Sequence, residues 1–205
     1  MGLLFLSTTK MNDLYKTIAT TSEGYYTQMK SKFYSFAIPV DTAEQVKEIV
    51  AQYRKKYYDA RHVCYAYVLG ANKSEFRAND DGEPSSTAGK PIHGQIVSRD
   101  LTNILVIVVR YYGGINLGTG GLIVAYRSAA QEALDAAEII EKQVEEVIIH
   151  SFQYTEMNAV MKVVKDTKCT VIAQNFDNNC TITLKIRQSE AENLKDKLKK
   201  IAFGQ

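Results

Sequence analysis

The stretch RYYGGINLGTGGL, residues 110–122, joins a predicted buried strand to a predicted long helix. The preceding residues 103–109, NILVIVV, are apolar and rich in β-branched side chains, which predicts a fully buried strand. After the stretch, residues recur at the three-and-four spacing of one helix face, at Leu122, Ala125, Tyr126, Ala129, Ala133 and Leu134. Alanine has high intrinsic helix propensity, so the sequence predicts a helix there.

Five glycines fall within the nine positions 113–121, where strand gives way to helix. Glycine is unfavourable in regular structure, so this density indicates positive φ angles or a group that approaches the backbone closely. Thr119 is the predicted N-cap, and the free amides beside it would favour a phosphate or carboxylate. The alternative is a tight turn without a ligand. Nucleotide-binding motifs do not fit, because a Walker loop needs lysine at Thr119 and a dinucleotide fingerprint from Gly118 needs glycine at Ile123.

Three further motifs accompany the glycine run, namely DARHVC at 59–64, DDGEP at 80–84 and TAGKP at 87–91. With the glycine run, their order and spacing resemble the IMPACT/YigZ family, in its bacterial YigZ-like branch. The resemblance is strong over residues 30–134 and looser after residue 141.

This resemblance implies an α+β protein of two domains. Residues 1–140 would form an IMPACT N-terminal-like domain, similar to the ribosomal-protein-S5 domain 2-like fold. Residues 141–205 would form a C-terminal domain resembling those of translation elongation factor G. The eukaryotic members restrain an initiation-factor kinase during amino-acid starvation, and RNA or ribosome binding is the usual proposal for bacterial members. The resemblance also implies that Asp81, Glu83, Lys90 and Arg110 form one surface.

The charge of the chain is close to neutral. Its 205 residues carry 25 basic and 23 acidic side chains, a formal charge of +2. Residues 1–140 hold 15 basic and 14 acidic side chains and the remainder 10 and 9, so each part carries +1. Any RNA contact must therefore come from a local patch.

The three cysteines, Cys64, Cys169 and Cys180, form no C-x-x-C pair, which argues against a disulfide framework or a zinc knuckle. The four apolar residues 3–6 are too few for a signal peptide, Leu6 breaks the myristoylation pattern, and no run approaches a membrane span. We expect a cytoplasmic protein without membrane association. Met1 or Met11 could be its start, and its oligomeric state stays open.

Upstream of the glycine run, the sequence predicts strands at 14–29 and 32–40 with a turn at 22–24, and then a helix that Asp41 or Thr42 caps. A strand follows at 62–69, and a polar loop at 72–87 is a candidate functional loop. Pro91 is expected to open the next helix.

Downstream, the pattern is strand 144–154, helix 157–165, strands 170–176 and 181–187 joined across 177–179, and helix 189–201. This βαββα order is typical of a ferredoxin-like domain. The domain boundary is expected within residues 138–143.

Two chemical alternatives concern the motifs before the glycine run. Asp80, Asp81 and Glu83 could hold a hard cation, but no complete metal motif is present and a solvated turn is favoured. Cys64 and His62 share one strand face, yet a cysteine in an apolar strand is usually buried and inert. No catalytic residue, metal ligand or cofactor is predicted.

The first hypothesis is therefore a non-enzymatic, translation-associated module that binds RNA or the ribosome. A second is an enzyme that binds a nucleotide or other phosphorylated molecule at residues 118–121, and a third is a regulator that binds a translation-regulatory protein. The candidate binding residues are Arg61, His62, Asp81, Glu83, Lys90, Arg110, Tyr111, Tyr112, Gly113, Gly114, Gly118, Thr119, Gly120 and Gly121.

Overall fold

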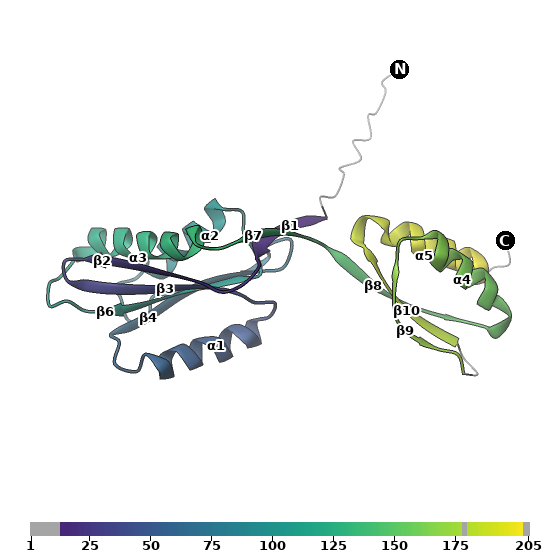
Figure 1. Cartoon of the computed structure of the whole chain (residues 1–205), viewed down its shortest axis with the longest axis horizontal. Helices are drawn as coiled ribbons and strands as arrows, with labels where there is room; N and C mark the ends of the chain where they lie inside the picture. The colour runs from purple at the N-terminus through teal and green to yellow at the C-terminus, as the bar shows by residue number, and fades with distance from the viewer. Residues whose placement is uncertain (1–12, 178–179, 203–205) are drawn as a thin grey trace, which may run out of the picture. The chain divides into compact units, whose positions relative to one another are not determined.

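The computed structural model describes residues 13–177 and 180–202 (Figure 1). The chain forms two compact units. One spans Tyr15–Lys142, and the other comprises Asp13, Leu14 and the residues from Gln143 onward. The predictions for the first residues, including Met11 as a start, lie outside the described residues.

The unit Tyr15–Lys142 is built on an antiparallel sheet of five strands. Their order is β2 (Ser22–Gln28), β3 (Ser31–Pro39), β6 (Ile104–Tyr111), β4 (His62–Leu69) and β5 (Glu75–Asn79). The predicted buried strand is β6, which lies in the middle of the sheet with seven of its eight residues buried.

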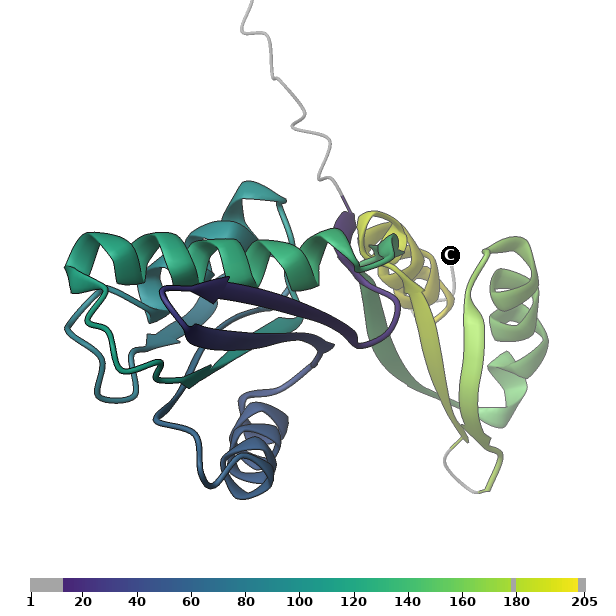
Figure 2. The same ribbon diagram turned by 60° about the vertical axis from the view of Figure 1, so that its left-hand side comes forward.

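Helices cover both faces of this sheet, as Figures 1 and 2 show. Helix α1 (Ala43–Lys56) lies on one face, and helices α2 (Gly89–Ser98) and α3 (Gly118–Asp135) lie on the other. Because side chains alternate along a strand, β6 supplies both cores. Leu105, Ile107 and Val109 pack in the core beneath α1, whereas Ile104, Val106 and Val108 pack in the core beneath α2 and α3.

Two helix starts test the capping predictions. The α1 prediction is confirmed, because the Thr42 hydroxyl accepts a hydrogen bond from the Gln45 amide at 3.2 Å. The α3 prediction is wrong. That helix begins at Gly118, one residue before Thr119, and its N-cap residue Leu117 makes no side-chain capping bond.

The turn predicted at residues 22–24 is also wrong, because these residues lie within β2. Gly24 allows β2 and α3 to pack closely, because a Cβ atom on it would lie 2.4 Å from the Ala133 backbone nitrogen of α3. The chain instead turns at Met29 and Lys30, whose φ angles are +45° and +65°. A methionine and a lysine at a left-handed turn carry a weaker sequence signal than glycine.

Two strands were missed by the sequence prediction. Strand β5 lies within the predicted loop 72–87, where four of its five residues are exposed, so no apolar alternation marks it. Strand β7 (Ile139–Gln143) pairs with β1 (Leu14–Ile18) in a separate two-stranded sheet. Pro91 is the third residue of α2 rather than its first.

The second unit contains β8 (Glu145–Phe152), the short helix η1 (Tyr154–Glu156), α4 (Met157–Asp166), β9 (Thr170–Asn175), β10 (Cys180–Arg187) and α5 (Gln188–Ala202). The strand order is β8-β10-β9, and both pairs are antiparallel. The core of this unit joins Ile148, Ile182 and Leu184 of the sheet to Val160 of α4 and Leu194 of α5. The predicted βαββα order is confirmed, although residues 178–179 of the predicted turn lie outside the described residues.

Among the described residues, no helix combines the length and apolarity that crossing a membrane requires.

Candidate functional site

A cleft of about 660 Å³ opens where β6 ends and α3 begins. It is lined by Arg61 and His62 at the start of β4, by Glu83 in the 80–88 loop, by Arg110 and Tyr112 at the end of β6, and by the first residues of α3. We call it the glycine-run cleft.

A buried ion pair forms one wall of this cleft. The Arg110 Nη1 atom donates to Glu83 Oε1 at 2.5 Å, and the side chains are only 6% and 4% exposed. The Tyr126 hydroxyl donates to the same oxygen at 2.8 Å, and His62 Nε2 lies 3.7 Å away. The hydrogen bonds from Arg110 and Tyr126 compensate the charge on Glu83, because a buried carboxylate needs partners to offset its lost hydration.

The guanidinium group of Arg110 keeps unused hydrogen-bonding capacity. Its Nε atom is buried without a partner, and Nη1 is the donor that reaches Glu83. The group lies 5.6 Å from the ring centre of Phe33 and 5.5 Å from that of Tyr112, distances at which an aromatic ring attracts a cation.

The uncapped start of α3 lies in the same cleft. Its first turn carries no acidic side chain, and its N-cap residue provides no bond to the free amides. Nothing lies within 4 Å of where a Cβ atom would sit on Gly118 or Gly120, so the backbone is open to an approaching group. Free amides and the helix dipole together favour an anion at this point.

The glycines of the run serve different purposes. Gly113 packs tightly, because a Cβ atom there would lie 2.1 Å from the Lys30 backbone. Gly114 and Gly118 have φ angles of +82° and +67°, and no atom lies near their Cβ positions. On Gly121, an added Cβ would lie 3.1 Å from the Leu117 side chain. Both reasons given for the glycines are therefore present, close packing and positive φ.

The two tyrosines point to opposite sides, as strand alternation predicts. Tyr112 lines the cleft with 47% of its surface exposed, and its hydroxyl donates to Asn116 Oδ1 at 3.0 Å. Tyr111 packs in the core beneath α1, and its hydroxyl donates to Asp59 at 2.8 Å. Burial, followed by the nearby Asp59 carboxylate, raises the pKa of Tyr111 to about 12. Tyr111 is therefore not part of the cleft.

The side chains of Asp80 and Asp81 stabilise the conformation of the 80–88 loop in which they lie. Asp80 accepts hydrogen bonds from the amides of Ser86, Ala88 and Gly89 at 2.8–3.0 Å. Asp81 accepts from the Val63 amide and pairs with Arg54, both at 2.6 Å. Within residues 13–177 and 180–202, no group of His, Cys, Asp and Glu side chains is arranged to hold a metal ion. The hard-cation alternative for this loop therefore finds no support in the geometry.

Cys64 is held as a buried thiol. Its Sγ atom lies 3.0 Å from the Asp80 carbonyl oxygen and 3.4 Å from the Tyr126 hydroxyl oxygen, and its single proton can be donated to either. Burial raises the pKa of this thiol far above its usual range, with a further contribution from Glu83. The Nδ1 atom of His62 instead forms a hydrogen bond with the carbonyl oxygen of Asp81 at 2.7 Å. The two residues share a strand but form no nucleophile-base pair.

The structure brings seven of the fourteen predicted residues together in the cleft. Arg61, His62, Glu83, Arg110, Tyr112, Gly118 and Thr119 line the cleft, whereas Lys90 lies on α2 and lines a different groove. The implied single surface of Asp81, Glu83, Lys90 and Arg110 is thus reduced to Glu83 and Arg110. Sequence reasoning missed Tyr126 as a partner of Glu83, although a tyrosine on a buried helix face signals a hydroxyl that needs a partner.

Comparison with known proteins identifies the family. Residues 29–134 match the Impact N-terminal domain. A Haemophilus influenzae protein named IMPACT family member is 32% identical over 178 residues, which cover 85% of this chain and 86% of that protein. The chain belongs to the IMPACT family. The family member YvyE of Bacillus subtilis is 29% identical over 190 residues, covering 93% of this chain and 88% of YvyE.

The two-domain α+β fold is shared with a solved relative. A crystal structure described as that of a hypothetical protein is 28% identical, covers 94% of each chain and superposes with a TM-score of 0.73. All residues that line the glycine-run cleft lie inside the segment that matches the Impact N-terminal domain. The cleft is therefore a feature of the IMPACT domain of this chain.

Proposed function

We propose that this protein is a non-enzymatic, translation-associated binding protein or regulator that contacts single-stranded RNA, free or on the ribosome, through the glycine-run cleft. The observation that carries the proposal is the buried Arg110 guanidinium, with an unpartnered Nε, in the same cleft as the uncapped start of α3. IMPACT family membership supports the translation-related part of the proposal, because the resemblance described above implies a role of this family in translation.

The chemistry of the cleft matches that of an RNA strand. Phosphate oxygens would accept hydrogen bonds from the first amides of α3 and from exposed Arg61 at the cleft mouth. The half-exposed ring of Tyr112 offers a surface on which an unpaired base can stack, worth about 1–3 kcal/mol per base. The formal charge of +2 predicts modest affinity that depends on this local patch.

The test measures binding of a fluorescein-labelled oligo(U) 12-mer by fluorescence anisotropy between 50 and 200 mM salt, about the range over which phosphate contacts are lost. Arg61→Ala and Tyr112→Ala are expected to weaken binding at least about tenfold, and Arg61→Ala should reduce the salt slope by about 1. The matched control is Arg77→Ala, an exposed arginine on β5. Equal affinities for Arg61→Ala and Arg77→Ala would refute the assignment to the cleft.

Ribosome association is tested separately by sedimentation of the tagged protein at low and moderate salt. We expect the wild type to migrate with a ribosomal fraction and Arg61→Ala to lose this association. Absence of the wild type from every ribosomal fraction would limit the proposal to free RNA.

A nucleotide or other small phosphorylated ligand at residues 118–121 is the second candidate. It is favoured by the volume of about 660 Å³, which lies in the usual range for small-molecule sites. ATP, GTP or their diphosphates at millimolar concentration would then raise the melting temperature. No shift with any of the four would remove this candidate.

A further inference from the structure

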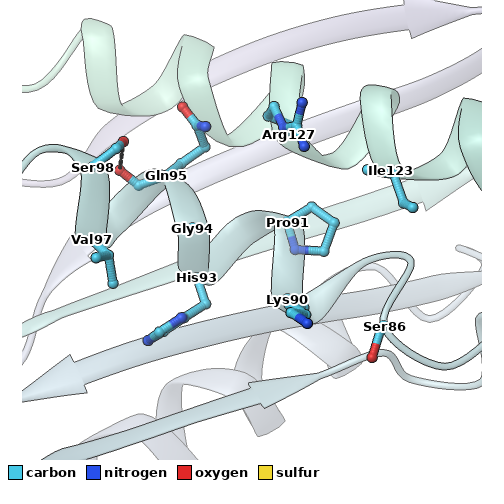
Figure 3. Close-up of a pocket in the computed structure, with 10 residues that line it drawn as sticks. All are labelled: Ser86, Lys90, Pro91, His93, Gly94, Gln95, Val97, Ser98, Ile123 and Arg127. Atoms are coloured by element: carbon cyan, nitrogen blue, oxygen red, sulfur yellow. Dashed lines mark hydrogen bonds between the residues drawn. The ribbon is translucent and has the colours of Figure 1, made fainter.

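A groove of about 780 Å³ lies between α2 and α3 (Figure 3). Lys90, Pro91, Gly94 and Val97 contribute to it from α2, and Ile123 and Arg127 contribute from α3. It shares no lining residue with the glycine-run cleft, so it is a separate feature of the same unit.

Gly94 in this groove has no role in packing the chain itself. It lies inside the ten-residue helix α2, where glycine costs about 1 kcal/mol relative to alanine. A Cβ atom on Gly94 would meet no atom within 4 Å, whereas on Gly89 it would lie 2.5 Å from the Asn79 backbone. Gly89 is therefore explained by an internal contact, and Gly94 leaves room for an external one.

The groove is positively charged. Lys90 and Arg127 both line it, and none of its lining residues is acidic. Neither side chain forms an ion pair or hydrogen bond with another of the described residues. Lys90 also lies in the first turn of α2, where the helix dipole disfavours a cation and no acidic side chain of the helix offsets it. The position of Lys90 in α2 is therefore not explained by stabilisation of the helix. Pairing with an acidic group of a partner would explain it.

The apolar part of the groove is partly exposed. Val97 is 56% exposed and lies on the same helix face as Lys90 and Gly94, at spacings of seven and three residues. On α3, Ile123 and Arg127 are four residues apart and therefore neighbours on that helix. At the side of the groove, Phe76 is 62% exposed and its ring lies 4.9 Å from that of His93.

We propose that the α2–α3 groove binds an acidic amphipathic helix of a partner protein. Apolar side chains of the bound helix would cover Val97 and Ile123, its carboxylates would pair with Lys90 and Arg127, and its backbone would approach Gly94. Charge complementarity selects this occupant, and a groove between two helices suits the side-chain ridges of a third helix. This site is independent of the RNA-binding proposal.

The experiment selects peptides from a random 16-residue phage library on the full-length protein. Selection on wild type is compared with selection on the charge-reversed variant Lys90→Glu/Arg127→Glu. The matched control is Lys47→Glu/Arg77→Glu, which makes the same charge change at exposed positions on α1 and β5. Circular dichroism and thermal melting confirm that each variant is folded.

We expect wild type and the control to enrich sequences with glutamate or aspartate and leucine-like residues at three-and-four spacing. An enriched peptide should bind at least tenfold more weakly to Lys90→Glu/Arg127→Glu. It should also bind at least tenfold more weakly to Gly94→Leu, which fills the groove without disturbing an internal contact.

Enrichment that is equal on the charge-reversed variant would overturn the proposal, as would neutral or basic peptides or no enrichment at all. A binding measurement with labelled oligo(U) tests whether the groove binds nucleic acid instead. If Lys90→Glu/Arg127→Glu loses oligo(U) binding and the Lys47→Glu/Arg77→Glu control retains it, the groove binds nucleic acid and the helix proposal is wrong.

Discussion

Glu83 is the residue on which the cleft depends most. Its Oε1 atom accepts from both Arg110 and Tyr126, which reach it from β6 and α3. In a buried ion pair, removing one partner leaves the other charge without compensation and costs about 3–5 kcal/mol. Arg110 therefore has a structural role in addition to any contact with a ligand.

We predict that Arg110→Met lowers the free energy of unfolding by about 3 kcal/mol or more, because it leaves the Glu83 carboxylate buried without its cation. Urea denaturation measures the change. The control is Arg54→Ala, whose ion pair with Asp81 involves a side chain that is 45% exposed and should contribute under about 1 kcal/mol. Equal losses for the two variants would contradict the prediction.

The cysteines provide a second prediction at this scale. At pH 8 the buried Cys64 thiol stays protonated, because its pKa is raised, so it should not react with a disulfide reagent in the native protein. Cys180 is also buried, whereas Cys169 is partly exposed. We therefore expect one fast-reacting thiol in native protein and three in urea, and Cys169→Ser should abolish the fast phase. A fast phase that is lost in Cys64→Ser instead would show that Cys64 is accessible.

At the scale of elements, the 80–88 loop is fixed by its own acidic side chains. Asp80 binds three amides at or just before the start of α2, and Asp81 joins the loop to β4 and α1. This arrangement positions Glu83 for its contact with Arg110. It also satisfies amides that α2 would otherwise leave free, since Ala88 provides no side-chain cap.

We predict that Asp80→Ala lowers stability by about 2 kcal/mol, in line with the loss of a helix cap and of further hydrogen bonds to a charged group. Hydrogen exchange should speed up at the amides of Ser86, Ala88 and Gly89. The control is Asp100→Asn, which removes an exposed ion pair with Lys73, tolerates the φ angle of +60° at this position and should change stability by less than about 1 kcal/mol. Unchanged exchange at these three amides would exclude this role for Asp80.

The elements also show where sequence patterns succeed. Strand β6 and helix α3 were predicted because their residues are buried in regular patterns, all apolar for the strand and one-sided for the helix. Strands β5 and β7 were missed because most of their residues are exposed. The start of α3 was misplaced because Leu117 is not a residue that signals an N-cap.

At the scale of the whole molecule, each unit has a core of its own, and both proposed sites lie within Tyr15–Lys142. The resemblance of residues 141–205 to elongation factor G domains stays a prediction.

We predict that the fragment 13–142, which keeps the whole of β1, folds alone and binds oligo(U) within about threefold of the full chain, since it retains both cores and every cleft residue. Circular dichroism, thermal melting and anisotropy measure this. A folded fragment that binds at least tenfold more weakly would show that the second unit contributes to the RNA site, and an unfolded fragment would show that the units depend on each other.

The sequence by itself determined the family, the two α+β parts, the buried strand, the long helix and the βαββα order. These follow from motifs and from periodicities that are local to each segment. Only the tertiary structure decided that Glu83 pairs with Arg110, 27 residues away, and with Tyr126, 43 residues away. It also placed Lys90 in the α2–α3 groove instead of the cleft. Such contacts depend on how the sheet and helices pack, and no pattern within one segment encodes them.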